Sequence, residues 1–235
     1  MRAPSDEAGP SASRPGSRRP GRIALDEVEA ALRRLQVEWD ELNAQLDARR
    51  DSFDDRVITN LLDGYAFVDT AVAHGFDLFA MGNLRHLLDL NAIVLCGINR
   101  DRRAAYASHA EASARRFYEE RDGGIQDVIE WLAAHADESP WARAAGVHVR
   151  ILTKPQLFIE GNHRTGALIM SYILLRDGQP PFVLTSENAL AYFDLSRTLR
   201  DTPKSGALPL FRLPGIRQRL DALLRGHANP RFLAA

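Results

Sequence analysis

Apolar residues recur at steps of three and four through most of this chain, and that spacing constrains its fold more than any other feature. The first run contains Leu25, Val28, Leu32, Leu35, Trp39, Leu42 and Leu46. Such spacing puts the apolar side chains on one face of an α-helix, with charged residues opposite. No segment shows the strong alternation of a half-buried strand. The sequence therefore predicts an all-α fold in which every helix needs partners for its apolar face.

Seven further segments show helical spacing or helix boundary signals. Gly75 and Gly97 each follow one of them, as glycine often does after a helix. Ser186 is the expected N-cap of another. After a first helix from Leu25 to Arg49, the expected helices cover residues 53–74, 82–96, 125–136, 141–154, 162–176, 186–200 and 214–225.

Composition favours one soluble helical domain. With 235 residues and 45% hydrophobic content, the chain can bury a substantial core. We expect residues 1–22, rich in Pro, Ser, Gly and Arg, to be disordered, residues 23–228 to form the domain, and residues 229–235 to fray. No apolar run reaches the roughly 18 residues that a membrane helix needs, and no signal peptide is evident.

Charge and cysteine content narrow the classes of partner and compartment. A formal net charge of −1 gives no reason to expect a nucleic-acid or membrane-surface protein. The single cysteine, Cys96, excludes an internal disulfide and fits a reducing compartment. Cys96 lies in an apolar run, so we expect it to be buried. Together these features predict a cytoplasmic location.

One polar loop stands immediately before the long apolar run Ala167–Leu175. It contains Glu160, the Gly161–Asn162 pair and Arg164. A loop that opens a buried helix presents free backbone N–H groups and the positive end of the helix dipole to an anion. Arginine adds a forked cation, and a carboxylate is a ligand for a metal that bridges phosphates. The pattern is typical of a phosphate site.

The same loop resembles the motif of the Fic (Fido) family, to which the Doc branch is related. That motif reads His-Pro-Phe-x-Asp/Glu-Gly-Asn-Gly-Arg-x-x-Arg, and this chain has Gln156-Leu157-Phe158-Ile159-Glu160-Gly161-Asn162-His163-Arg164-Thr165-Gly166-Ala167. The resemblance implies a Fic-type helical bundle over about residues 50–200, with the motif loop between two central helices. It also implies Mg²⁺, ATP or another nucleotide, and a target protein whose hydroxyl group is modified.

Three departures from the motif bear on chemistry. Gln156 stands where the family has its general base, and an amide has no useful pKa for that role. His163 replaces a glycine, and Ala167 replaces an arginine that in adenylylating members binds the terminal phosphate. The Doc branch, which phosphorylates its target, also lacks that arginine. The resemblance therefore predicts a transferase with weak, altered or lost catalysis, a catalytically dead interaction module, or a Doc-like phosphotransferase. An unrelated helical domain with a chance loop is the remaining alternative.

The resemblance also distributes roles among the loop residues. Glu160 would be the metal ligand. The alternative is a solvated carboxylate whose negative charge is stabilised by the helix dipole. The resemblance assigns the binding of nucleotide phosphates to Gly161, Asn162, His163, Arg164, Thr165 and Gly166. For Asn162 the alternative is a helix N-cap, and for Arg164 it is an internal ion pair.

Two other segments bear on regulation and on target binding. Thr59, Asp63 and Gly64 resemble the family's inhibitory-helix motif, Ser/Thr-x-x-x-Glu-Gly/Asn, although an ordinary core helix has the same pattern. Because Ala167 removes the arginine partner of the inhibitory carboxylate, we expect no inhibition through Asp63. Residues 97–124 stand where the family has a hairpin flap, but they are Arg-rich and helical in spacing.

Overall fold

A computed structural model describes residues 19–119 and 123–234 of the chain. These residues form ten α-helices and two short 3₁₀ segments, with no strand among them, so the all-α prediction is confirmed. The helices are α1 (Leu25–Gln45), α2 (Asp55–Ala73), α3 (Arg85–Cys96), α4 (Arg100–Ala105), α5 (Ala107–Glu119), α6 (Ile125–Ala134), α7 (Pro140–Leu152), α8 (Asn162–Arg176), α9 (Ser186–Asp201) and α10 (Ala207–Gly226). The 3₁₀ segments are η1 (Met81–Asn83) and η2 (Pro230–Phe232).

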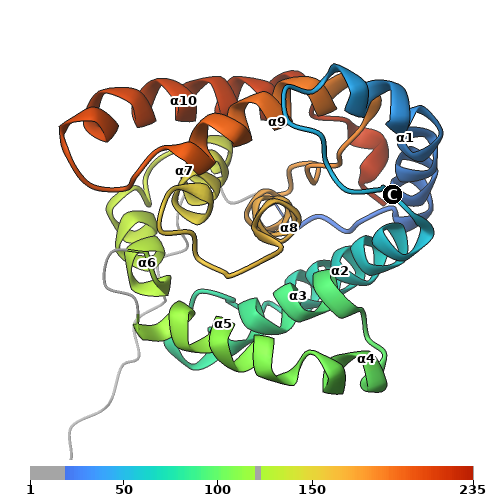
Figure 1. Ribbon diagram of the computed structural model, residues 1–235, viewed down its shortest axis with the longest axis horizontal. Coiled ribbons are helices and arrows are strands. Elements are labelled where there is room, and N and C mark those ends of the chain that lie inside the picture. The colour runs from blue at the N-terminus through green and yellow to red at the C-terminus, as the bar shows by residue number, and fades with distance from the viewer. Residues whose placement is uncertain (1–18, 120–122, 235) are drawn as a thin grey trace, which may run out of the picture.

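Helix α8 is the centre of the domain and is seen end-on near the middle of Figure 1. Its residues from Leu168 to Leu175 are all buried, so this part of the helix has no exposed polar face. A helix that is apolar all round has to be covered on every side. The cover comes from α7, α2 and α3, which pack against it. Because α8 starts at the polar loop, this packing fixes the loop at one end of the buried helix.

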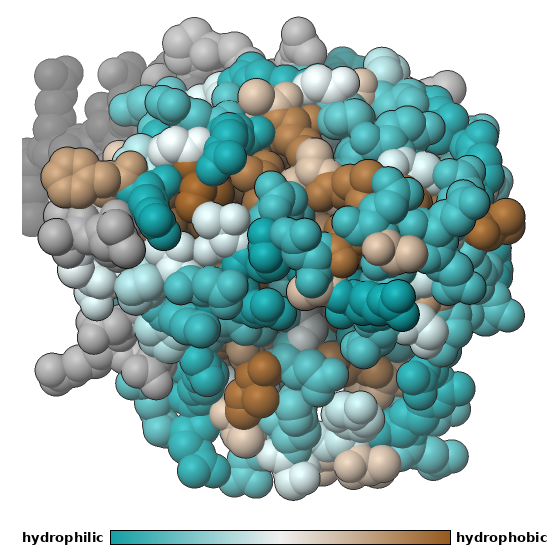
Figure 2. All heavy atoms as spheres, turned by 45° about the horizontal axis from the view of Figure 1, so that its top comes forward, coloured by the Kyte–Doolittle hydropathy of each residue, from teal (hydrophilic) through white to brown (hydrophobic). Residues whose placement is uncertain are grey.

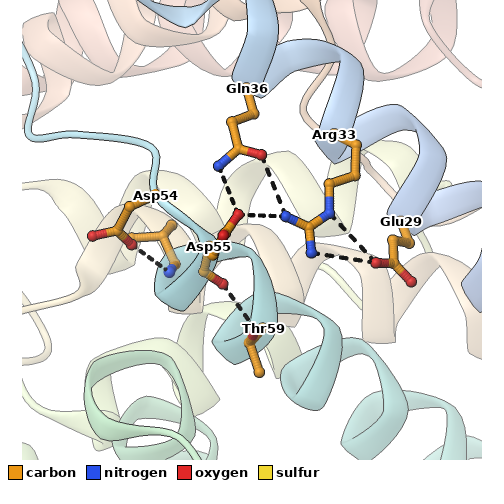
Figure 3. Close-up of polar contacts among 7 residues, drawn as sticks. Glu29, Arg33, Gln36, Asp54, Asp55 and Thr59 are labelled. Carbon is orange, nitrogen blue, oxygen red and sulfur yellow. Dashed lines mark hydrogen bonds and ion pairs between the residues drawn. The ribbon is translucent and has the colours of Figure 1, made fainter.

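Local capping explains where several helices begin. The Asp54 carboxylate accepts a hydrogen bond from the Val57 N–H at 2.9 Å and starts α2, as Figure 3 shows. Ser139 caps α7, as its position before Pro140 predicts. The cap of α9 is Thr185, with a reciprocal bond between its backbone and Asn188, and Ser186 is the first helical residue instead.

Two helix boundaries differ most from the prediction. Helix α1 ends at Gln45, four residues earlier than expected, where the chain turns towards α2. Helix α10 begins at Ala207 and continues through Pro214, which we expected to start it. A proline removes one backbone hydrogen bond but does not have to end a helix that is held by packing elsewhere. The packing here is supplied by Ile216 and Leu220, which are buried, and by the contact of α10 with α7.

The chain ends are more ordered than the sequence predicts. Residues 1–18 of the expected disordered tail lie outside the described residues, but Arg22 pairs with Asp69 at 2.6 Å. The C-terminal segment was expected to fray, and residues 229–234 instead pack on the domain. Phe232 is 2% exposed and its carbonyl accepts from the Ala24 N–H at 3.0 Å. Burial of the Phe232 ring stabilises the segment. The short polar stretches beside Phe232 in the sequence do not indicate that the ring is buried.

The remaining surface is mostly hydrophilic, as the face in Figure 2 shows, with apolar residues in small separate groups. None of the helices in the described ranges is both long and apolar enough to span a membrane. Cys96 is 3% exposed, which confirms that it is buried.

Candidate functional site

The polar loop runs from α7 to α8 and is anchored in the core by two apolar side chains. Leu157 and Phe158 are fully buried, and the Phe158 ring stacks on Phe117 of α5 with centroids 5.8 Å apart. The Leu157 N–H donates to the Ile151 carbonyl at 3.1 Å, which ties the loop to the last turn of α7. These anchors fix the position of the polar residues that follow.

Asn162 closes the loop on itself. Its side-chain oxygen accepts from the Phe158 N–H at 2.9 Å, and its amide nitrogen donates to the Phe158 carbonyl at 2.8 Å. The side chain is 4% exposed. Asn162 is therefore not the N-cap of α8, and it can reach a ligand only through its backbone N–H.

Asn91 of α3 supports the loop from the other side. Its amide nitrogen donates to the Glu160 carbonyl at 2.9 Å and to the Thr165 hydroxyl at 3.0 Å. Thr165 and Gly166 are both buried, so their predicted contacts with a nucleotide are not supported by their positions. They belong to the support of the loop, because a buried hydroxyl that is already bonded to Asn91 does not face solvent.

Gly161 makes the sharp turn that starts α8. Its φ is +77°, and a Cβ there would lie 2.9 Å from the Asn91 amide nitrogen. Both the left-handed conformation and the close approach require glycine. No side chain in the described part of the chain caps the helix at this residue. The first backbone N–H groups of α8, at Asn162, His163 and Arg164, are thus left for a ligand or for water.

Glu160 presents its carboxylate outwards at the mouth of the loop. The side chain is 56% exposed, and its nearest basic group is the His109 ring, with Nε2 3.9 Å from Oε2. The described residues contain no group of three or more candidate metal ligands. A single carboxylate suits Mg²⁺, which keeps several waters and takes further ligands from substrate phosphates. The site fits Mg²⁺ only together with a phosphate ligand.

Arg164 is half-buried in the first turn of α8, where its charge opposes the helix dipole. Burial lowers the pKa of its guanidinium, and the Glu160 charge counteracts this in part. Its Nη1 donates to the Val94 carbonyl at 3.3 Å, and the same carbonyl accepts from Asn60 of α2 at 3.2 Å. Within the described residues no carboxylate lies within 4.0 Å of Arg164, so the internal ion pair weighed as its alternative role is not formed there.

His163 points away from Glu160, towards α9 and the segment before α2. Its Nε2 lies 3.4 Å from Nη1 of Arg50, and its ring centroid is 6.5 Å from that of Phe193. Burial, followed by the charges of Arg50 and its neighbours, lowers the pKa of His163 to about 3. The ring is therefore neutral near pH 7, and it cannot serve as a cationic phosphate ligand.

Gln156 occupies the first position of the motif with its amide engaged inside the protein. Its nitrogen donates to the Leu152 carbonyl at 3.2 Å, and its oxygen accepts from the Asn162 amide at 3.4 Å. The backbone carbonyl accepts from Nε of Arg116 at 2.7 Å. An amide in this position can orient a neighbour, but it has no proton-accepting group.

Within the described residues, no hydrogen bond or ion pair joins Thr59, Asp63 or Gly64, which resemble an inhibitory helix, to the loop. The Thr59 hydroxyl donates back to the Asp55 carbonyl at 2.8 Å (Figure 3). Gly64 lets α2 approach α8, since a Cβ there would lie 2.4 Å from a methyl carbon of Leu168. Burial raises the pKa of Asp63, and the charge that opposes this is Arg103 of α4 rather than a residue of the loop. This arrangement agrees with an ordinary core helix.

Residues 97–124, which the resemblance places at the family's flap, were predicted to be helical in spacing, and α4 and α5 are helices over most of this segment. Residues 120–122 of it lie outside the described residues. Helix α5 crosses the motif loop and supplies Arg116 and His109 to it. Sequence reasoning missed both residues, and also Asn91 and Arg50. Asn91 had a detectable signal, because a polar residue stands among Leu90, Ala92 and Ile93 in an apolar run. The others come from polar segments in which no residue stands out.

Comparison with known proteins gives two short matches. The chain is 36% identical to Protein adenylyltransferase fic-1 of Caenorhabditis elegans over 29% of its own length, and the match covers 14% of that protein. The same values hold for Protein adenylyltransferase fic-1 of Caenorhabditis briggsae. No family model matches the chain. The two matches support a relationship to the Fic family. They span about one seventh of the length of those relatives. The activity of the whole relatives is therefore not assigned to this chain by the matches.

Proposed function

We propose that the loop between α7 and α8 binds the phosphates of a nucleotide, such as ATP, together with Mg²⁺. The observation that carries the proposal is the uncapped start of α8 with Arg164 half-buried beside it and Glu160 exposed on the same loop. Free N–H groups and a guanidinium that has no carboxylate partner within the described residues favour an anion. The bound Mg²⁺ would neutralise phosphate charge, with Glu160 as its protein ligand.

We further propose that the site derives from one that transfers a nucleotidyl group to a hydroxyl of a target protein. In that reaction the hydroxyl oxygen forms a bond to the α-phosphorus, and the bond from that phosphorus to the diphosphate breaks. The hydroxyl proton needs an acceptor, and Gln156 cannot supply one. A missing base lowers such rates by about 100- to 10,000-fold, whereas binding and positioning remain. The proton would then go to water, and transfer would be slow.

A second candidate function is a nucleotide-binding interaction module without catalysis. The hydrogen bonds of the Gln156 amide to Leu152 and Asn162 favour it, because they give Gln156 a role in holding the loop. The comparisons give only the names of the fic-1 proteins. A name does not distinguish between the two functions. A phosphoryl transfer like that of the Doc branch is the third outcome to be tested.

Gln156→His tests the two candidates against each other. Purified protein, wild type or variant, is incubated with Mg²⁺, a mixture of candidate proteins, and ATP labelled either at the α- or at the γ-phosphate. If the site is a disarmed adenylyltransferase, the variant should transfer the α-label at least about 100-fold faster than wild type. Transfer of the γ-label alone would indicate phosphorylation. No transfer by a variant that still binds ATP would favour the interaction module.

A further inference from the structure

Arg50 reaches the start of α8 from the segment that joins α1 to α2. Its Nη1 lies 3.4 Å from Nε2 of His163, and the guanidinium carbon lies 4.9 Å from the centre of the Phe193 ring. The side chain is half-buried, and its Nε has no hydrogen-bond partner among the described residues. A chain segment far from the loop in sequence thus places a cation beside the first turn of α8.

Arginines elsewhere in the described part of the chain show what a paired guanidinium looks like. Arg33 contacts the carboxylates of Glu29 and Asp55, as Figure 3 shows. Arg217 likewise lies 2.8 Å from the Glu138 carboxylate. Within the same described residues, Arg50 lies within 4.0 Å of no carboxylate. The difference matters because a cation removed from water is costly unless an anion or several acceptors replace the water.

The surroundings of Arg50 disfavour its positive charge. Burial and the nearby charge of Arg200 lower the pKa of Arg50, and the Asp51 carboxylate opposes them only in part. His163, with a pKa of about 3, is neutral and supplies no counter-charge. Arg50 and Arg164 are both close enough to His163 to act on its ring. Two guanidiniums that have no carboxylate partner among the described residues therefore lie near one residue, His163, at the positive end of α8.

We propose that Arg50 and Arg164 bind two different phosphate groups of one di- or triphosphate, with Arg50 as a second phosphate-binding arginine supplied by the α1–α2 segment. The proposal rests on the nucleotide site proposed above and specifies its ligand class. Guanidiniums bind phosphate through forked, charge-assisted hydrogen bonds, and the unpartnered Nε of Arg50 is one such donor. A monophosphate has a single phosphate group for the two cations, so it should use Arg164 and the α8 N–H groups alone.

Calorimetric titration of the full chain with ATP, ADP and AMP, each with Mg²⁺, tests this assignment. Arg50→Gln should weaken ATP and ADP binding about tenfold or more and change AMP binding less than threefold. Arg164→Gln should weaken all three. The matched control is Arg217→Gln, which removes the same charge from a carboxylate-paired site and should leave all three affinities unchanged. Melting curves of the ligand-free proteins accompany the titrations, because a purely structural Arg50 would lower the melting temperature without changing affinity.

The outcomes separate this proposal from the one on which it rests. Wild-type protein that binds none of the nucleotides overturns both. Wild-type protein that binds ATP with an affinity that Arg50→Gln leaves within twofold overturns only the role of Arg50. If Arg50→Gln does not fold, Arg50→Lys replaces it, since lysine keeps the charge but loses the forked donors. Arg50→Lys should then weaken ATP more than AMP, and equal affinities for wild type and this variant would overturn the role.

Discussion

His148 should make the stability of the domain depend on pH in a calculable way. The residue lies in α7, is fully buried, and has no hydrogen-bond partner on either ring nitrogen among the described residues. Burial lowers its pKa to about 4, although the nearby Gly166 backbone, which forms no well-aligned hydrogen bond with the ring, opposes this shift in part. An unfolded histidine has a pKa of about 6.5. Between these values the unfolded chain binds a proton that the folded protein excludes, so stability is full above pH 6.5 and falls as the pH drops towards 4.

The size of the effect follows from these two pKa values. Lowering the pH from 7.5 to 5.5 should reduce the free energy of unfolding by about 1.3 kcal/mol through His148 alone. His163, with its pKa lowered to about 3 chiefly by burial, should contribute a similar loss. Together they should remove roughly 2–3 kcal/mol, a substantial share of the stability of an ordinary domain.

Urea unfolding of wild type and His148→Gln, followed by circular dichroism at pH 7.5, 6.5 and 5.5, measures this difference. The variant should lose about 1 kcal/mol less than wild type between pH 7.5 and 5.5, whatever its absolute stability. Val147→Ala, which removes buried volume from the neighbouring position but no titratable group, should keep the wild-type pH dependence. Equal pH dependence in wild type and His148→Gln would refute the reasoning that His148 is held neutral by burial.

Three further perturbations have expected outcomes. Gly161→Ala should destabilise the protein by about 1–3 kcal/mol, because the left-handed conformation is strained for alanine and its Cβ would lie 2.9 Å from Asn91; an unchanged melting temperature would contradict this. Asp69→Asn removes the carboxylate that pairs with Arg22 and should lower the melting temperature by about 2–8 °C, with little change as the contrary result. Glu160→Gln should weaken ATP binding in Mg²⁺ but leave binding in EDTA and the melting temperature unchanged; equal loss with and without Mg²⁺ would exclude a metal role.

The fold was largely predictable because helical spacing and helix ends are local signals. Ser139 before Pro140 marked the start of α7, and the apolar run after Ala167 marked a helix buried on all sides. Signals of this kind do not show how a polar segment packs. The short C-terminal segment was therefore misjudged, since only the buried position of Phe232 explains why it is ordered.

The candidate site could be predicted only for residues that lie next to one another in the sequence. The turn at Gly161 and the exposed carboxylate of Glu160 follow from the loop itself. Asn162 was expected to face a ligand or cap α8, but its amide is used by the Phe158 backbone, a contact within a loop whose path the sequence does not define. Arg50 reaches the loop from the segment between α1 and α2, and Arg116 reaches it from α5; both are far from the loop in sequence, and no local pattern distinguishes them from solvated arginines.

Isothermal titration of wild type and Arg164→Gln with ATP in Mg²⁺ tests the central claim, that the start of α8 is a phosphate site, most directly. Wild type should bind one ATP per chain, and the loss of the half-buried guanidinium should weaken binding about tenfold or more. The ligand-free variant should remain folded, because Arg164 has one hydrogen bond, to the Val94 carbonyl, within the described residues. Absence of binding by wild type at millimolar ATP, or equal affinity in the two proteins, would contradict the account.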